Sequence, residues 1–273
     1  MRPRLRYVLI TLIAVAVLFA SGLWWLRHPQ QPPLASETAV FFSPHPDDET
    51  FGMAQAISHQ VRNGRRVVVV LMTDGEGSSL GAHWDSNGGT DRDADGDVDK
   101  WDFGLTRRAE FEAAMGALGV TEWRYEGAAD SQGAEGWQDG SLSSGDLSDE
   151  ITQIASEYGS ATYFTVMRYE GDQARLLGDA KEHPDHTALC GAVQQLANDR
   201  DADAYFYKPY TFYRSLRILR WSPLVSRGDA EDFERKRAAV RAYSEIAKVS
   251  TLTLWENSQT DRDEYAVPLS WLE

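Results

Sequence analysis

The chain has 273 residues, of which 42% are apolar, so it can bury a sizeable hydrophobic core and is not an intrinsically disordered protein. Its 42 acidic and 27 basic residues give a formal charge of −15, which repels phosphate backbones and argues against a nucleic-acid partner. Its one cysteine, Cys190, excludes an internal disulfide, and the helical spacing of its apolar neighbours predicts a small core residue.

Residues 1–27 are typical of a membrane anchor. Three arginines in MRPRLR precede the uncharged stretch 7–26, which is long enough to cross about 30 Å of bilayer as a helix. The arginines favour the cytoplasmic side, so the rest of the chain is expected to be extracytoplasmic, in a periplasm or at a cell surface. The alternative is a signal peptide cleaved near Ala20, which would release a secreted protein. A Pro- and Gln-rich linker, 28–37, follows.

From residue 38 onward, segments typical of strands and of helices alternate. AVFFS is a short apolar run, RVVVVLMT has the continuous apolar pattern of a strand buried on both faces, and strands are also expected in TEWRYEG, ATYFTVM and YFYKPYTFYRS. Apolar residues recur at helical spacing in 50–64, 106–120, 147–159, 186–199 and 229–248. This alternation predicts a single α/β domain over 38–273, with a Rossmann-like, mostly parallel sheet and helices on both faces. Two long polar insertions, 75–104 and 128–146, are expected at the carboxyl edge of the sheet.

Two charged motifs follow predicted strands. HPDD (45–48) comes directly after the first strand, and HPDH (183–186) lies between a later strand and a helix. Ligands of open α/β sheets bind beyond the carboxyl ends of the strands. His45, Asp48 and a histidine of HPDH form a ligand set that suits a catalytic zinc, with Asp47 free to accept a proton from its water. Either motif alone is more often a cap or a surface turn, but two at one sheet edge indicate a hydrolase.

The ordered series PHPDDE, TDGE, RRAE, a loop aspartate and HPDH resembles the LmbE-like or PIG-L superfamily of zinc-dependent N-deacetylases, over most of residues 38–250. The resemblance implies that His45, Asp48 and His186 bind zinc and that Asp47 is the general base. It also implies that His183 stabilises the oxyanion or protonates the departing amine. Such relatives remove N-acetyl groups, typically from an N-acetylglucosamine unit, so an N-acetylated sugar or glycan is the expected substrate.

The resemblance extends to supporting positions. Arg107 is expected to bind substrate hydroxyls or to pair with a carboxylate, and Asp130 to contact sugar hydroxyls or to cap its loop. Glu49 is expected to orient a loop or a helix N-terminus, and Asp74 to support a ligand histidine or the loop. The family's late His-x-Ser-Gln element is replaced here by AYSEI around Tyr243.

The segment DRDADGDVDKWD (91–102) matches the pattern of a calcium-binding loop, with glycine at its sixth position. Its last ligand is aspartate in place of the usual glutamate, which favours weaker binding. The alternative is a solvated acidic loop. The candidate calcium residues are Asp91, Asp93, Asp95, Asp97, Asp99 and Asp102.

The function expected from these motifs is removal of an N-acetyl group from an amino sugar of a glycan or glycolipid, with catalytic Zn²⁺ and structural Ca²⁺. One alternative is a metal-dependent phosphoesterase, which usually needs a second metal about 4 Å away. The other is a calcium-stabilised glycan-binding module with an inactive site, which would bind sugar without turnover.

Overall fold

The structure, a computed structural model, describes residues 10–18, 32, 36–128, 136–167, 183–208, 224–249 and 263–271. Residues 10–18 are helical and exposed. Within these ranges, no helix combines the length and the apolar character needed to cross a bilayer. Most of the predicted anchor and linker lies outside the described residues, so the anchor stays a prediction.

Within the residues that the structure describes, seven strands form one sheet. Their bounds are β1 (Thr38–Ser43), β2 (Arg66–Leu71), β3 (Glu122–Tyr125), β4 (Thr162–Val166), β5 (Ala204–Tyr207), β6 (Leu224–Ser226) and β7 (Glu264–Pro268). The strand order is β3-β2-β1-β4-β5-β7-β6. The first five strands in that order are parallel, and β7 pairs antiparallel with both β5 and β6. The prediction of a mostly parallel sheet is confirmed.

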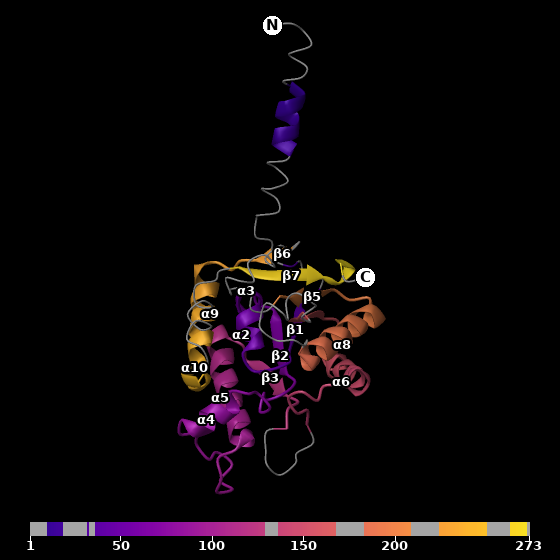
Figure 1. Cartoon of the computed structure of the whole chain (residues 1–273). Coiled ribbons are helices and arrows are strands. Elements are labelled where there is room, and N and C mark those ends of the chain that lie inside the picture. The colour runs from indigo at the N-terminus through magenta and orange to yellow at the C-terminus, as the bar shows by residue number, and fades with distance from the viewer. Residues whose placement is uncertain are drawn as a thin grey trace.

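Helices cover both faces of this sheet. Their bounds are α2 (Asp48–Gly52), α3 (Ala54–Arg62), α4 (Gly81–Ser86), α5 (Lys100–Leu118), α6 (Ser144–Ser156), α8 (Pro184–Arg200), α9 (Ala230–Ala242) and α10 (Ser244–Val249), with a 3₁₀ turn, η2, at Leu269–Trp271. Figure 1 shows α5 and α9 on one side of the sheet and α6 and α8 on the other.

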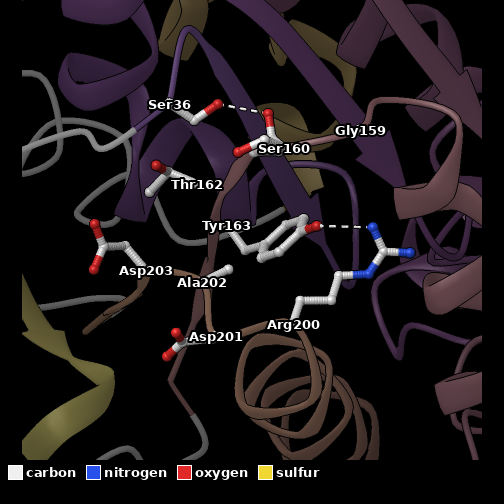
Figure 2. A pocket seen from close by; sticks show the side chains of 10 residues that line it. Ser36, Gly159, Ser160, Thr162, Tyr163, Arg200, Asp201, Ala202 and Asp203 are labelled. Atoms are coloured by element: carbon white, nitrogen blue, oxygen red, sulfur yellow. Dashed lines mark hydrogen bonds between the residues drawn. The ribbon is translucent and has the colours of Figure 1, made fainter.

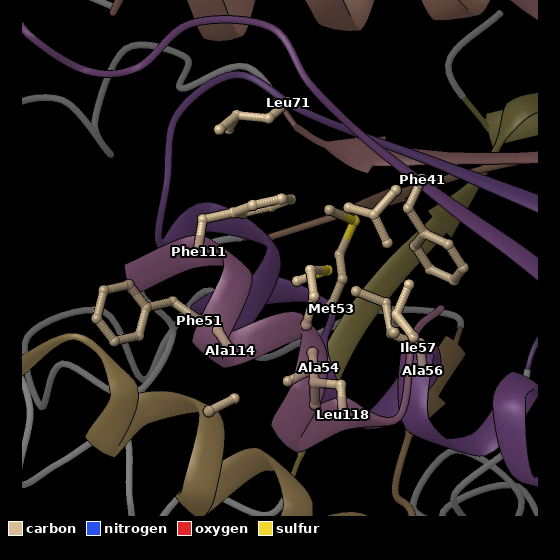
Figure 3. Packing of buried hydrophobic residues seen from close by; sticks show 14 of the residues in the cluster. Phe41, Phe51, Met53, Ala54, Ala56, Ile57, Leu71, Phe111, Ala114 and Leu118 are labelled. Carbon is tan, nitrogen blue, oxygen red and sulfur yellow. The ribbon is translucent and has the colours of Figure 1, made fainter. Parts of the chain in front are cut away.

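The alternation of side chains along β1 divides the core into two layers. Ala39 and Phe41 pack with residues of α3, α5 and α9, whereas Val40 and Phe42 pack with α6 and α8. Figure 3 shows the first layer, in which Phe41 lies among side chains of the α3 and α5 side. Cys190 is buried in the second layer, so its prediction as a core residue is confirmed.

The C-terminal part differs from the sequence prediction. The segment 229–248 was expected to be one helix, but it forms α9 and α10, which are separated at Tyr243. Tyr243 has ψ 53°, outside the helical region, and its side chain is fully buried. The antiparallel strands β6 and β7 were not expected either.

Glu110 of α5 binds the start of α10, the helix that packs beside it. Its carboxylate accepts hydrogen bonds from the backbone N–H groups of Glu245 and Ile246, in the first turn of α10. An acceptor at a helix N-terminus satisfies N–H groups that have no partner within the helix. Burial, opposed by these bonds, raises the pKa of Glu110 to about 7.

Glu110→Gln is expected to flatten the pH dependence of stability. The pKa of Glu110 in the unfolded chain is about 4.3, well below its value in the folded chain. As the pH rises from about 4.5 to 7, the Glu110 carboxyl therefore loses its proton in the unfolded chain but keeps it in the folded chain. This difference lowers the free energy of unfolding. The contribution of this group is about 3 kcal/mol over that window. Urea unfolding of both proteins across pH 4.5–8 measures it, and parallel curves for the two would contradict the prediction.

Candidate active site

The candidate site lies where the order of the sheet reverses. The chain passes from β1 to β2 on one side of β1, whereas β4 joins β1 on its other side. Ligands of such sheets bind at this switch point, beyond the carboxyl ends of the strands. HPDD follows β1, and HPDH opens α8, which packs against β4. The two motifs, which are 138 residues apart in sequence from His45 to His183, meet there with ring centroids 4.4 Å apart.

The HPDD turn holds Asp47 in an unusual backbone conformation. Asp47 has φ 104°, a region that residues other than glycine rarely adopt. Its N–H donates to the Glu49 carboxylate at 3.0 Å and to the Tyr243 hydroxyl at 2.9 Å. The N–H of Phe51 donates to the Asp47 carbonyl at 2.8 Å, which starts helix α2. Glu49 therefore orients the loop, which is one of the two roles expected for it.

The predicted zinc ligands converge on one carboxylate oxygen. Asp48 Oδ2 lies 3.0 Å from His45 Nδ1 and 3.0 Å from His186 Nε2. Two ligands that are each about 2.0–2.1 Å from a tetrahedral zinc ion lie about 3.3 Å apart. The donor atoms of His45, His183 and His186 also lie within 4.8 Å of one another. The donor types therefore suit zinc, and Asp48 Oδ2 lies at ligand spacing from each histidine, whereas the group of donor atoms that all lie within 4.8 Å of one another is His45, His183 and His186.

Two further aspartates, which the sequence motifs did not indicate as functional, lie against the histidines of this centre. Asp185 Oδ2 lies 3.1 Å from His45 Nε2 and accepts the N–H of Gly140 at 2.7 Å. Asp139 Oδ1 lies 3.3 Å from His45 Nε2 and 3.8 Å from His183 Nε2. Asp185 stands between the histidines of HPDH, a signal that was available in the sequence, because carboxylates commonly orient metal-binding histidines. Asp139 has no comparable signal, since it depends on how the loop folds.

The buried charges of this centre depend on one another. Burial lowers the pKa of His45, but the carboxylates of Asp139, Asp185 and Asp48 outweigh burial and hold it well above the usual range. Burial raises the pKa of Asp48, but His186 and His45 reverse this and hold it well below its usual range. The opposite charges of His45 and Asp48 therefore stabilise each other and offset the cost of burying both groups.

Arg107 of α5 holds the carboxylate of Asp47. Its Nη2 donates to Asp47 Oδ2 at 2.9 Å and to the carbonyl of Pro46, and its Nη1 donates to the carbonyl of Gly75 at 3.2 Å. The Arg107 side chain is only 5% exposed. Pairing with a carboxylate was one of its two expected roles, and the contact with substrate hydroxyls stays a prediction. Burial raises the pKa of Asp47 well above its usual range, and the charge of Arg107 opposes that shift.

Gly75→Ala is expected to lower kcat by about 10-fold to 100-fold, because a displaced Arg107 would misplace Asp47. Gly75 has φ 67°, and a Cβ there would lie 1.9 Å from Arg107 Nη1. The matched control is Gly64→Ala, where φ is 72° and no atom lies within 4 Å of the added Cβ. Steady-state kinetics of the two variants separate crowding of Arg107 from backbone strain. Equal kcat values for both variants would contradict the prediction.

Of the two other predicted residues, Asp74 is described by the structure and Asp130 is not. Asp74 accepts two bonds from Arg108, at 2.9 and 2.8 Å, and Arg108 also donates to the Gly127 carbonyl at 3.1 Å. Asp74 therefore supports the loop that follows β3, which is one of its two expected roles. Asp130 lies outside the described residues, so its proposed contact with sugar hydroxyls stays a prediction.

The acidic loop brings three of its six candidate calcium residues close together. Donor oxygens of Asp91, Asp93 and Asp102 lie within 4.8 Å of one another. Asp99 and Asp102 form the capping box that starts α5, and Asp102 also accepts the N–H groups of Arg92 and Asp93. Backbone N–H groups therefore already use oxygens that the calcium loop would need. The Asp95 and Asp99 carboxylates are not in the cluster, Asp97 was expected to contribute its backbone carbonyl, and the calcium site stays a prediction.

A separate cavity of about 370 Å³ lies near the amino ends of β4 and β5, whereas the candidate active site lies beyond the carboxyl ends of the strands. Figure 2 shows the residues that line this cavity. Its lining includes Thr162 at the start of β4, together with Ser36, Tyr163 and Arg200. Arg200 donates to the Tyr163 hydroxyl at 3.5 Å. The cavity contains none of the residues of HPDD or HPDH, so it is distinct from the candidate active site.

Comparison with known proteins agrees with this geometry. The family described as PIG-L: GlcNAc-PI de-N-acetylase matches residues 40–197. The 1D-myo-inositol 2-acetamido-2-deoxy-alpha-D-glucopyranoside deacetylase of Mycolicibacterium gilvum is 29% identical over 160 residues, which are 54% of this chain and 49% of that protein. The chain thus spans about half the length of this curated relative.

Two solved structures share the fold. The zinc-inhibited form of teicoplanin deacetylase Orf2 has a TM-score of 0.57 at 21% identity, covering 81% of this chain and 90% of that one. GalB, the 4-carboxy-2-hydroxymuconate hydratase of Pseudomonas putida, has a TM-score of 0.59 at 14% identity, covering 85% and 96%. A hydratase and a deacetylase on one fold show that the fold alone does not define the reaction. The family match covers more than half of the sequence and includes both histidine motifs, and the chain belongs to the PIG-L family.

Proposed function

We propose that this protein is a zinc-dependent hydrolase that removes the N-acetyl group from an N-acetylated amino sugar. The observation that carries the proposal is the convergence of His45, Asp48 and His186 beside Asp47 at the switch point of the sheet. Membership of a family described as a GlcNAc-PI de-N-acetylase supports it. So does the similarity to a GlcNAc-inositol deacetylase and to a teicoplanin deacetylase.

The roles of the side chains follow from their positions. When bound, zinc would lower the pKa of its water toward about 7 and polarise the acetyl carbonyl. Asp47 would take up the proton released by the attacking water. His183 would stabilise the oxyanion that develops on the carbonyl oxygen, or give a proton to the nitrogen as the C–N bond breaks. Acetate and a free amine would be the products.

The surroundings of these residues suit such chemistry. Asp48 and His186 are at most 2% exposed, and Asp47 and His45 are less than 10% exposed. Buried groups that are already oriented stabilise developing charge without reorganising at the moment of reaction. Arg107 and the two acceptors of the Asp47 N–H would keep the base in place during turnover.

Acetate release by the full-length protein in detergent, reconstituted with zinc, tests the proposal. The substrates are GlcNAc-inositol, N,N′-diacetylchitobiose and a longer N-acetylglucosamine oligosaccharide. We expect release of acetate and of an equal amount of free amine from at least one of them, and loss of both after chelation. No release from any of the three by the zinc-loaded protein would contradict the proposal.

A second assay, with p-nitrophenyl phosphate as the substrate, and a measurement of oligosaccharide binding separate the alternatives. A phosphoesterase would release phosphate from p-nitrophenyl phosphate and would need a second metal close to the first. Within the described residues, the clusters that suit a metal at the switch point share His45 and His183, so they define one centre and not two. A glycan-binding module would retain the oligosaccharide without producing acetate.

Two predictions concern the rest of the molecule. Ca²⁺ bound in the loop 91–102 would stiffen the insertion that precedes α5, and its removal would lower the thermal midpoint of the zinc-loaded protein.

Residues 1–27 would anchor the protein with its catalytic part outside the cytoplasm, or would be removed as a signal peptide. Mass spectrometry of the protein isolated from membranes distinguishes the two.

A further inference from the structure

A buried hydrogen-bond network that does not include the proposed metal ligands holds the backbone of Asp47. The Asp47 N–H donates to Glu49 Oε2 at 3.0 Å and to the Tyr243 hydroxyl at 2.9 Å. The Tyr243 hydroxyl donates in turn to Glu49 Oε1 at 2.6 Å, and Thr50 Oγ1 donates to the same oxygen at 2.6 Å. Tyr243, Glu49 and Thr50 are fully buried. The hydroxyl of a residue 196 positions away in sequence therefore completes the turn that carries the proposed base.

The contact explains how Asp47 keeps a disfavoured conformation. With φ 104°, Asp47 would relax to a negative φ if its N–H were free to turn. Such a rotation would carry the carboxylate away from the guanidinium of Arg107 and from the metal ligands. Surrounding structure must fix a strained residue for it to persist at a functional site. Here the acceptors on the Asp47 N–H fix it, together with the Phe51 N–H on its carbonyl and Arg107 on its carboxylate.

The position of Tyr243 in the fold is also specific. It stands at the junction of α9 and α10, where the helix breaks. Glu110 fixes the first turn of α10 to α5, the helix that also carries Arg107. Helix α5 thus reaches Asp47 by two routes. Arg107 holds the carboxylate directly, and the Glu110 contact steadies the junction from which Tyr243 holds the backbone.

We propose that Tyr243 is a positioning residue for the base Asp47, acting through the Asp47 N–H without touching substrate. This inference rests on the proposed function. It predicts that loss of the hydroxyl lowers the rate of the chemical step and leaves the binding of substrate and of zinc nearly unchanged. A hydroxyl with only a structural role would lower stability with no specific effect on kcat.

Tyr243→Phe tests the inference, with Tyr207→Phe as the matched control. Tyr207 is also a fully buried tyrosine whose hydroxyl is hydrogen-bonded, at 2.9 Å to Ser226, but it lies on β5 outside the turn. We expect Tyr243→Phe to lower kcat by about 10-fold to 100-fold, as is typical when a supporting hydrogen bond near a metal centre is lost. We expect KM and zinc content to stay within about twofold of wild type, and Tyr207→Phe to keep kcat within about twofold. Unchanged kcat in Tyr243→Phe, or an equal loss in both variants, would overturn the inference.

Hydrogen exchange of the wild-type Asp47 amide provides a readout that needs neither activity nor a folded variant. We expect this amide to be protected as strongly as the amides of β1. Exchange at the rate of an exposed loop amide would overturn the inference. If the wild type releases no acetate, the proposed function fails, and the exchange rate still decides whether Tyr243 and Glu49 hold the turn.

Discussion

Asp47→Asn is expected to lower kcat for acetate release by about 10²-fold to 10⁴-fold, the range typical of losing a general base. Asparagine has nearly the same shape, but its amide does not accept the proton of the attacking water. The backbone bonds from the Asp47 N–H to Glu49 and Tyr243 do not involve the replaced group. The turn and the adjacent ligand Asp48 are therefore expected to stay in place, and zinc content is expected to match wild type.

Asp199→Asn is the matched control for this variant. Asp199 is an exposed residue near the C-terminal end of α8, far from the HPDH turn. Its replacement by asparagine makes the same chemical change as Asp47→Asn. Its kcat is expected to equal that of wild type. Zinc-loaded Asp47→Asn with a kcat within about 10-fold of wild type would contradict the role of Asp47 as the base.

Lys236→Met is expected to lower the free energy of unfolding by about 3–5 kcal/mol, the usual loss when one partner of a buried ion pair is removed. Lys236 Nζ lies 3.1 Å from Glu264 Oε1, and each side chain is 1% exposed. Glu264 also accepts the N–H groups of Gln55 and Ala56, in the first turn of α3. Without the lysine, the carboxylate of β7 would remain buried against α3 with no cation beside it.

Arg237→Met provides the comparison, because the Arg237 side chain is 38% exposed and pairs with an exposed Glu234. An exposed pair contributes about 0.2–1 kcal/mol, so this variant is expected to unfold nearly like wild type. The double variant Lys236→Met/Glu264→Gln is expected to recover part of the loss, since no unpaired charge remains in the core. Urea unfolding at pH 8 measures all three. A loss below about 1 kcal/mol in Lys236→Met would show that the pair contributes no more than a surface pair.

The part of the fold that positions the site follows from local patterns. Continuous apolar runs predicted β1, β2 and β4, because a strand covered by helices on both faces has no polar side. Parallel strands end at a common edge, and this is why HPDD and HPDH were expected to meet there. The antiparallel strand β7 had no such signal, since its sequence EYAVP begins with a charged residue and ends in proline.

The contacts that organise the base depend on tertiary structure. Tyr243 reaches Asp47 from the last helices of the described chain, and the sequence pattern indicated only one continuous helix there. Asp139 reaches His45 from an insertion with no regular periodicity. Predicted strands indicate which motifs share an edge of the sheet, whereas the contacts that irregular loops and late helices make at that edge depend on packing that no local pattern encodes.

The zinc content of the purified protein tests the central claim most directly. After incubation with zinc and removal of the excess, wild type is expected to retain one zinc ion per chain. His45→Ala, Asp48→Ala and His186→Ala are each expected to retain almost none, whereas His83→Ala, a change at an exposed histidine of α4, is expected to retain the wild-type amount. A wild type without bound zinc, or full zinc retention in the three ligand variants, would contradict the account.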